Sequence, residues 1–451
     1  MGTMQKDPSG PSVTSVPHLT TALSGPLQEI ETRLLERQDD IEQWLHAEWL
    51  RTPAPFYTSV DLRNAGFKLA PVDTNLFPGG FNNLNPAFQP LCVQAVQMAV
   101  ERFCPLARGV LIIPENHTRN PFYLENLGAL AQILKRAGLN VRIGSLLPEL
   151  TTPTSISLAS GRSLLLEPVQ REGNRVKVGD FYPCLVLLNN DLSVGPPPLL
   201  VDLAQAVVPP LKLGWWKRLK SGHFTEYGRI ATEFADRVDL DPWFIDPIFR
   251  RCGKIDFHKR TGEDCLAQNV TEVLEAIRIK YRAYGIDQEP FVIVKADAGT
   301  YGMGIMTVRD PKDVYGLNRK QRNKMAVVKE GHQVQDVLVQ EGVYTFETWG
   351  TPPAVAEPVV YLFDRFVVGG FYRVHSTRGS DENLNAPGMH FESLAFADTC
   401  GLPDANRGPD AEPNRFYAYG VIARLAALAA ARELSVSTAA NAVSPAAESG
   451  S

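Results

Sequence analysis

The stretch FVIVKADAGTYGMGIMTV, residues 291–308, decides the fold because it joins two apolar strands through a glycine-rich turn. The first strand places Lys295 at its end. Three glycines come before the second strand: Gly299, Gly302 and Gly304. Glycines let the backbone turn its amides toward an anion and keep the loop thin enough to close over it. The stretch predicts a phosphate-binding β-hairpin; a tight hairpin with a solvent-exposed lysine is the alternative.

Other nucleotide-binding motifs do not fit this loop. No GK[ST] follows the glycines, as a Walker A loop requires, and GTYGMG lacks the spacing and the following helix of a dinucleotide fingerprint. In protein kinases the glycine-rich loop precedes the lysine strand, whereas here Lys295 precedes the glycines, and the sequence contains no HRD or DFG run. A strand–loop–strand phosphate site remains.

A second apolar strand, VLVQEGV at residues 337–343, ends in Gln340, Glu341 and Val343. A strand edge offers backbone donors and acceptors that suit an adenine ring, and an adjacent carboxylate suits the sugar hydroxyls. The alternative is a strand that runs out into solvent. The pattern therefore indicates a nucleoside site without proving one.

The early stretch SVDLRNAGFKLAPVDTNLFPGGFNNL, residues 59–84, is rich in polar groups. Arg63 and Lys68 supply positive charge. Asp73 and Asn75 are two residues apart, so on a strand both side chains face the same side. Such hard oxygen ligands suit Mg²⁺, which completes its shell with water and phosphate. The alternative is that Asp and Asn form turns beside Pro and Gly.

A third polar stretch, GGFYRVHSTRGSDENLNAPGMHF, covers residues 369–391. Arg373 lies on its strand and suits a carboxylate or phosphate. The following loop carries Asn385 and is long enough to act as a lid. His375 and Glu382 are candidates for a general base. An ordinary surface loop with an exposed arginine and an exposed histidine is the alternative.

Composition excludes several classes of protein. The 451 residues are 44% hydrophobic and 21% charged, with 45 Lys+Arg against 50 Asp+Glu, which predicts a globular chain without an electrostatic attraction to nucleic acid or membranes. No apolar segment precedes the first helix, and no CxxC pair occurs. We therefore expect a cytoplasmic protein with reduced thiols at its six cysteines: Cys92, Cys104, Cys184, Cys252, Cys265 and Cys400.

The remaining pattern predicts a mixed α/β chain. A surface helix with one apolar stripe is expected over Leu27–Leu50, and an Ala-rich helix over Phe416–Leu434. GVLIIPE (109–115), a helix over Tyr123–Gly138 and the strand LNVRIG form a strand–helix–strand unit, which is typical of a layered α/β domain. A further strand is expected at CLVLLNND.

Together these stretches resemble a known class of enzyme. VKADAGTYGMGI, VLVQEGV and GGFYRV followed by NLNAPGMHF look like an ATP-grasp ligase. APVDTNLFPGGFNNL is similar to the proteobacterial glutamate–cysteine ligase family, which begins glutathione synthesis in some bacteria. The order of parts also resembles eukaryotic-type glutathione synthetases. The resemblance extends from about Pro53 to Leu434.

The resemblance implies an ATP-grasp fold with an α/β substrate domain and a glycine-rich lid. The expected division is a disordered tail (1–25), an N-terminal helix with the substrate and metal segment (26–107), the α/β substrate domain (108–210), the nucleotide-binding domain with lid loops (211–434) and a disordered tail (435–451).

It also implies ATP and Mg²⁺ as cofactors, held by particular residues. The phosphates and adenine would contact Lys254, Lys295, Gly299, Thr300, Tyr301, Gly302, Gly304, Gln340, Glu341 and Val343. The metal would bind Asp73, Asn75 and Asp297. The amino-acid substrates would contact Arg63, Lys68, Phe77, Gly79, Gly80, Asn82, Asn83, Arg373 and Asn385. Arg63, Lys295 and Arg373 would act in catalysis.

The implied reaction joins L-glutamate to L-cysteine through a γ-glutamyl phosphate and yields γ-glutamylcysteine. A glutathione synthetase or another ATP-grasp carboxylate–amine ligase is the nearest alternative, and a nucleotide-binding scaffold without catalysis is a second. Neither nucleic acid nor a membrane is expected as a partner, and a homodimer is left open.

Overall fold

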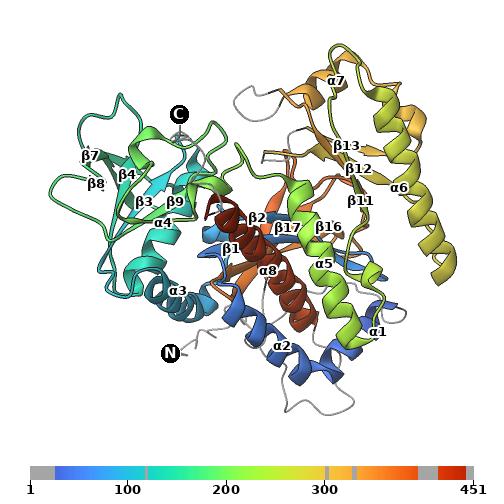
Figure 1. The fold of residues 1–451 in the computed structure, drawn as a ribbon, viewed down its shortest axis with the longest axis horizontal. Coiled ribbons are helices and arrows are strands. Elements are labelled where there is room, and N and C mark those ends of the chain that lie inside the picture. Colours follow the sequence, from blue (N-terminus) through green and yellow to red (C-terminus); the bar gives the residue numbers. More distant parts are fainter. Residues whose placement is uncertain (1–25, 117–119, 300–303, 328–332, 395–414, 443–451) are drawn as a thin grey trace, which may run out of the picture.

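A computed structural model describes residues 26–116, 120–299, 304–327, 333–394 and 415–442 (Figure 1). The predicted sites Thr300, Tyr301 and Gly302 lie outside these residues, as do the expected tail 1–25 and residues 443–451. Within the described residues the strands form three large sheets and one two-stranded ribbon. No helix there combines the length and the apolar character needed to cross a membrane.

The central sheet is antiparallel and combines strands from both ends of the chain. Its order is β18-β17-β16-β1-β2, with β15 paired to β16. The strands are β1 (Tyr57–Asn64), β2 (Leu69–Asn75), β15 (Thr348–Trp349), β16 (Ala354–Phe363), β17 (Phe366–His375) and β18 (His390–Ser393). β1 belongs to the expected segment 26–107 and β16 to the expected nucleotide-binding domain 211–434. Because these two strands pair, both segments contribute to one sheet.

The second sheet is mostly parallel and lies on the left in Figure 1. Its order is β10-β9-β3-β4-β6-β5, and only the β5–β6 pair is antiparallel. Its elements are β3 (Gly109–Pro114), β4 (Asn140–Ser145), β5 (Thr154–Ser157), β6 (Ser163–Pro168), β9 (Leu185–Asn189) and β10 (Ala206–Val208), with helices α3 (Gln89–Phe103) and α4 (Pro121–Arg136). The Asn120 side chain accepts from the amides of Phe122 and Tyr123 and so begins α4.

The third sheet has four antiparallel strands in the order β11-β14-β12-β13. Its elements are β11 (Phe249–Cys252), β12 (Val292–Ala296), β13 (Ile305–Val308) and β14 (Val337–Glu341), with α6 (Glu263–Tyr284) and α7 (Arg319–Ala326). β12 and β13 are the two strands predicted around the glycine-rich turn, and their pairing of Lys295 with Ile305 confirms the predicted hairpin. At the turn, Gly299 and Gly304 have positive φ angles of 103° and 63°. Residues with a side chain rarely adopt such angles, which explains why glycine occupies these two positions.

Four further helices complete the fold: α1 (Pro26–Glu36), α2 (Gln38–Arg51), α5 (Lys220–Val238) and α8 (Arg415–Ala442). α8 packs on the central sheet, and α1 and α5 pack against α8. α8 contacts α5, β1 and β2, and from Tyr417 to Ala431 nearly every apolar side chain is buried. An apolar surface on all sides is expected for a helix enclosed by other elements. α8 continues past the predicted end at Leu434 to Ala442, so the start of the expected disordered tail is helical.

The remaining elements are short: β7 (Gln170–Glu172), β8 (Arg175–Lys177), η1 (Phe81–Asn83), η2 (Pro86–Phe88), η3 (Pro198–Leu200), η4 (Leu211–Leu213), η5 (Pro242–Phe244) and η6 (Pro311–Val314). The single helix predicted over Leu27–Leu50 is divided at Arg37 into α1 and α2. The division leaves Ile30 in α1 and Ile41 in α2 within the same apolar cluster.

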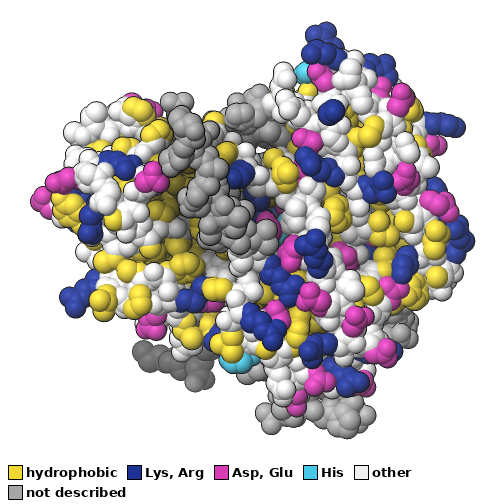
Figure 2. Space-filling view, in the orientation of Figure 1, with side chains coloured by type: hydrophobic (Ala, Val, Ile, Leu, Met, Phe, Trp, Pro, Cys, Tyr) yellow, Lys and Arg dark blue, Asp and Glu magenta, His cyan; other side chains and the backbone are white. Residues whose placement is uncertain are grey.

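Alternation along β16 shows how the central sheet serves two cores. Val360 and Leu362 belong to the cluster that contains α8, whereas Tyr361 and Phe363 belong to the cluster beneath α3 and α4. Successive strand residues point to opposite faces, so both faces of the sheet are buried. On the face of the molecule seen in Figure 2, Lys and Arg side chains are interspersed with Asp and Glu.

Candidate active site

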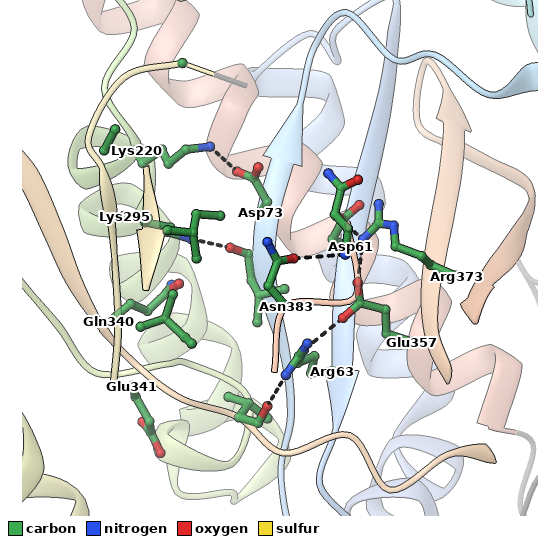
Figure 3. A pocket seen from close by; sticks show the side chains of 17 residues that line it. Asp61, Arg63, Asp73, Lys220, Lys295, Gln340, Glu341, Glu357, Arg373 and Asn383 are labelled. Carbon is green, nitrogen blue, oxygen red and sulfur yellow. Dashed lines mark hydrogen bonds and ion pairs between the residues drawn. The ribbon is translucent and has the colours of Figure 1, made fainter. Parts of the chain in front are cut away.

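One pocket lies where β1 and β2 of the central sheet meet β12 and β14 of the four-stranded sheet (Figure 3). Its lining includes charged side chains from both sheets and from the start of α5. The residues that line it are Asp61, Arg63, Val72, Asp73, Lys220, Ile293, Lys295, Ala296, Gly299, Ile305, Gln340, Glu341, Val343, Glu357, Arg373, Asn383 and Asn385. The pocket therefore combines sequence stretches that lie far apart in the chain.

The junction of the two sheets is made by Lys295. Its Nζ donates to the carbonyl oxygen of Val72 at 2.6 Å, across 223 positions of sequence. Lys220, the first residue of α5, lies on the same side, and its Nζ donates to Asp73 Oδ1 at 2.7 Å. The glycine-rich hairpin and the early Asp-x-Asn stretch thus converge on one place.

The charges in this part of the pocket alter each other's ionisation. Burial lowers the pKa of Lys295 to about 7; Asp73 opposes this change, and Lys220 adds to it. Burial disfavours the charged form of Asp73, but Lys220 and Lys295 outweigh it and hold the Asp73 pKa well below its usual range. Lys220 and the protonated form of Lys295 are thus placed side by side in the pocket, where they suit a bound anion.

Asp61 and Asp73 face each other across the β1–β2 ladder, where they are direct partners in the register. Partners of this kind point to the same face, and two like charges there repel each other. Burial raises the pKa of Asp61; Arg373 opposes that effect, and Glu357 and Asp73 add to it. The two carboxylates would be stabilised by a divalent cation between or beside them.

The residues present fit a magnesium ion, although they do not form a complete cage. Among the described residues no group of three His, Cys, Asp or Glu side chains is arranged to hold a metal. Mg²⁺ is commonly bound by one or two carboxylates and completes its shell with water and substrate phosphate. Asp61 and Asp73 meet that requirement beside the two lysines.

Arg63, Glu357 and Arg373 form a buried chain of ion pairs on the other side of the pocket (Figure 3). Arg63 Nε donates to Glu357 Oε2 at 2.9 Å, and Arg373 Nη1 donates to Glu357 Oε1 at 2.5 Å and to Asp61 Oδ2 at 2.9 Å. Burial disfavours ionisation of Glu357, but the two arginines lower its pKa. Arg373 is thereby aimed at the pocket together with Asp61.

Arg63 also holds the predicted lid loop. Its Nη1 donates to the carbonyl of Val343 at 3.2 Å, and its Nη2 donates to the carbonyl of Glu382 at 2.5 Å. The loop carries Asn383 and Asn385 to the pocket wall and also borders a neighbouring cavity of about 800 Å³. All three guanidinium nitrogens of Arg63 have protein partners, so this side chain holds the loop at the pocket wall. Its expected contact with substrate stays a prediction.

The end of β14, which was predicted to bind adenine and ribose, lines the pocket, but Glu341 does not have the free carboxylate that was expected. Gln340 Nε2 is buried and has no hydrogen-bond partner among the described residues, so it suits a ligand acceptor. The Glu341 carboxylate, however, accepts from Lys68 Nζ at 2.8 Å, Trp243 Nε1 at 3.1 Å and the Ile248 amide at 2.9 Å. Both oxygens are engaged, which leaves little capacity for sugar hydroxyls.

Lys68 is a structural residue and not the substrate contact expected from the sequence. It is completely buried, donates to Glu341 Oε2 and to the carbonyl of Asp246 at 2.9 Å, and lies 4.4 Å from the centre of the Trp243 ring. Burial lowers its pKa, and Glu341 opposes that change. A buried pair of this kind fixes the end of β14 to β2.

Two expected metal ligands are engaged elsewhere. Asn75 uses its amide group in a local turn, accepting from the Phe77 amide at 2.9 Å and donating to the Phe77 carbonyl at 3.3 Å. Asp297 is fully buried and caps α5: its carboxylate accepts from the amide and the hydroxyl of Ser221, both at 2.7 Å, and pairs with Arg251 at 3.0 Å. A carboxylate at a helix N-terminus is stabilising there.

Other predicted residues lie away from the pocket. Lys254 is exposed beyond β11 and does not line it, and Gly304 is outside the lining, although its carbonyl bonds to the Ala296 amide. His375 is buried and bonds to the Pro387 carbonyl at 3.1 Å, contrary to the exposed histidine considered above. Glu382 pairs with Arg378.

The expected amino-acid loop lies at the junction of the central and parallel sheets. Its members are Phe77, Gly79, Gly80, Asn82 and Asn83. The Phe81 amide in this loop donates to Asn126 of α4 at 3.0 Å. Gly80 has a φ of +93°, and a Cβ there would come within 3.0 Å of the Tyr361 hydroxyl, so only glycine fits. None of the loop lines the pocket.

Sequence reasoning missed Asp61, Glu357 and Lys220. Asp61 is two residues before Arg63 on a strand, so alternation places both on one face, and Glu357 interrupts an otherwise apolar strand. Both signals were present. Lys220 lies in KRLKSGHF without a motif, and only the packing of α5 against Asp297 brings it to Asp73.

Two antiparallel sheets enclose a charged pocket, to which one sheet contributes a lysine and a glycine turn and the other contributes carboxylates, and with the third, mostly parallel sheet they make a mixed α/β fold. This confirms the predicted fold class. Residues 31–434 match the protein family described as glutamate-cysteine ligase. The chain belongs to this family, and it is therefore an ATP-using ligase that acts on small molecules.

A crystal structure agrees with this assignment. It is that of a protein provisionally named gamma-glutamylcysteine synthetase from Methylobacillus flagellatus KT, which is 62% identical, with a TM-score of 0.86 over 94% of this chain and 99% of that one. D-alanyl-alanine synthetase A from Vibrio cholerae O1 biovar eltor str. N16961 is only weakly similar, at 12% identity and a TM-score of 0.32 over 70% and 80% of the chains. Comparison with curated proteins gives no match.

Proposed function

We propose that this chain joins the γ-carboxylate of L-glutamate to the amine of L-cysteine, with ATP converted to ADP and phosphate. The observation that carries the proposal is the meeting of Lys295 and Lys220 with Asp61 and Asp73 in one pocket between two sheets. Membership of the glutamate–cysteine ligase family supports the choice of substrates.

The chemistry explains why such a pocket is needed. A carboxylate resists attack by an amine because oxide is a poor leaving group. A γ-carboxylate oxygen therefore attacks the γ-phosphorus of ATP, which releases ADP and forms an acyl phosphate. The cysteine amine then attacks the acyl carbon, phosphate leaves with that oxygen, and the amine loses a proton. The protein mainly supplies positioning and charge stabilisation.

Each side of the pocket has a separate task in this scheme. Lys220 and Lys295 bind the transferred phosphoryl group from the side of α5 and β12. Asp61 and Asp73 would hold Mg²⁺, which neutralises phosphate charge when bound. Gln340 offers its unpartnered amide to the nucleotide base. Arg373 binds a substrate carboxylate, and the loop held by Arg63 excludes water that would hydrolyse the acyl phosphate.

ATP affinity should depend on pH through Lys295. Its pKa is lowered to about 7, mainly by burial. Bound phosphate favours the protonated lysine, so above this pH binding requires proton uptake, and affinity should fall by up to about tenfold per pH unit. Calorimetric titration of ATP with Mg²⁺ in buffers of different ionisation enthalpy measures both effects. An affinity that stays constant from about pH 7 to 9 would contradict this role.

The substrate pair is tested by phosphate release. We expect rapid release with glutamate plus cysteine and release near background with γ-glutamylcysteine plus glycine, because the second pair requires a longer acyl donor. Omitting cysteine should also suppress steady release, since water is excluded from the acyl phosphate. Strong turnover only with the second pair would make the chain a glutathione synthetase. ATP binding without turnover of either pair would indicate a nucleotide-binding scaffold.

A further inference from the structure

Two cysteines lie side by side at a distance from the active-site pocket. Cys252 is the last residue of β11, and Cys265 lies in the first turn of α6. Their sulfur atoms are 3.2 Å apart, although the residues are separated by 13 positions. Neither residue lines the pocket. The contact therefore brings together two nucleophilic thiols, and neither thiol has a role in the proposed ligase reaction.

The surroundings give the two thiols different roles. Cys252 is 1% exposed, whereas Cys265 is exposed at the surface. Asn269 Nδ2 donates to the Cys265 sulfur at 3.5 Å, and Arg250 Nε in turn donates to Asn269 Oδ1 at 2.8 Å. The Cys265 sulfur is thus held beside Cys252 and stays accessible to a reagent from solvent.

We propose that Cys252 and Cys265 form a thiol–disulfide site that is oxidised by low-molecular-weight disulfides. The sulfurs must approach by only about 1 Å to reach the bond length of a disulfide, about 2.05 Å. The sequence contains no CxxC motif and so did not indicate this pair. The two cysteines meet only because β11 packs beside α6 in the fold. The reduced thiols expected from the sequence are the starting state of this site.

The exchange proceeds in two balanced steps. The Cys265 thiolate attacks one sulfur of the reagent, so a mixed disulfide forms and one small thiol leaves. Cys252 then transfers its proton to the second departing thiolate and attacks the Cys265 sulfur, which closes the protein disulfide. Two protein thiols are oxidised and one reagent disulfide is reduced to two thiols. Burial raises the pKa of Cys252 to about 12, which agrees with its place as the second thiol to react.

The cross-link would close the segment from Cys252 to Cys265, which carries Lys254 and the turn between Asp256 and Thr261. Such a closure restricts the unfolded chain and so stabilises the folded one. Because β11 is an edge strand of the four-stranded sheet, the link also fastens that edge to α6. Oxidised protein should therefore unfold at a higher temperature than reduced protein.

The test uses the full chain treated with glutathione disulfide and then freed of reagent. We expect the number of free thiols to fall by two, peptide mass mapping to show a Cys252–Cys265 link, and dithiothreitol to reverse both changes and the rise in unfolding temperature. Cys252→Ser should retain a glutathione adduct on Cys265. Cys265→Ser should show neither link nor adduct at Cys252. Cys104→Ser, which keeps the pair, should behave as the unchanged chain does.

A stable glutathione adduct on Cys265 of the unchanged chain, without the internal link, would overturn the proposal. Loss of two thiols that persists in Cys265→Ser would do the same. The substitution at exposed Cys265 leaves the core intact, so the test holds even where Cys252→Ser does not fold. None of these readouts depends on ligase activity, and the failure of this site is therefore distinguishable from the failure of the proposed function.

Discussion

Replacing Lys295 with methionine is expected to lower kcat/KM for ATP by about a thousandfold, the largest effect of any single substitution in the pocket. Lys295 lies on β12 and lines the pocket with Asp73 and Lys220, where its ammonium group would meet the transferred phosphoryl group. Methionine keeps the length and apolar character of the stem but removes the charge. Steady-state kinetics with varied ATP measures the loss.

Folding must be checked separately for this variant. The lysine also donates to the Val72 carbonyl, and losing one hydrogen bond costs about 1 kcal/mol of stability. The thermal transition of Lys295→Met should therefore stay cooperative and close to that of the unchanged chain. Lys217→Met, at an exposed lysine near the start of α5, is the matched control and should retain full activity. Collapse of the fold with Lys295→Met would make this lysine structural.

Asp73→Asn is expected to lower kcat by about a hundredfold and to raise the Mg²⁺ concentration needed for half-maximal activity. Asparagine keeps the shape and an acceptor for Lys220 but removes one of the two carboxylate charges that face each other across the β1–β2 ladder. Activity measured against Mg²⁺ at saturating ATP separates the two effects.

Asn75→Ala provides the contrast for this prediction. Because the Asn75 side chain bonds only to Phe77 among the described residues, its loss should reduce stability slightly and leave the Mg²⁺ requirement unchanged. If Asn75→Ala changed the metal requirement and Asp73→Asn did not, Asn75 would hold the metal and the role proposed for Asp73 would be wrong.

The sequence predicted the hairpin well because its information is local. The apolar run ending in Lys295, the glycines with positive φ and the apolar strand beyond them specify each other within a few residues. The same holds for α4, where Asn120 caps the start and Gly138 follows the end with a φ of +89°. Elements of this kind need no knowledge of the rest of the chain.

The partners of charged side chains were harder to predict, because they depend on packing between distant segments. Lys68 was expected to contact substrate and Lys220 carried no motif, but Lys68 pairs with buried Glu341 and Lys220 reaches Asp73. Asp297 directly follows strand β12, where a metal ligand was expected, yet its carboxylate accepts hydrogen bonds from Ser221 at the start of α5. The spacing of residues in the sequence predicts which side chains share a face of a strand or helix. The residues that these side chains contact depend on how distant segments pack in the fold.

Lys254 shows the same limit for a short motif. The resemblance assigned Lys254 to the phosphates, but this lysine follows β11, an edge strand of its sheet, and does not line the pocket. In the proposed function the phosphate-binding role belongs to Lys220, which reaches the pocket from the start of α5. The contact between Lys295 and Val72 nevertheless brings the glycine-rich hairpin to the Asp-x-Asn stretch, and the resemblance had assigned these two stretches to the phosphates and the metal of one reaction.

Isotope transfer tests the central claim most directly, namely that one pocket phosphorylates a carboxylate before the amine attacks. Glutamate labelled with ¹⁸O in its γ-carboxylate is supplied with cysteine, ATP and Mg²⁺, and the released phosphate is examined by mass spectrometry. The mechanism predicts one ¹⁸O atom in each phosphate, because the oxygen that attacks phosphorus leaves with it. Unlabelled phosphate, formed at the rate of peptide synthesis, would contradict the mechanism.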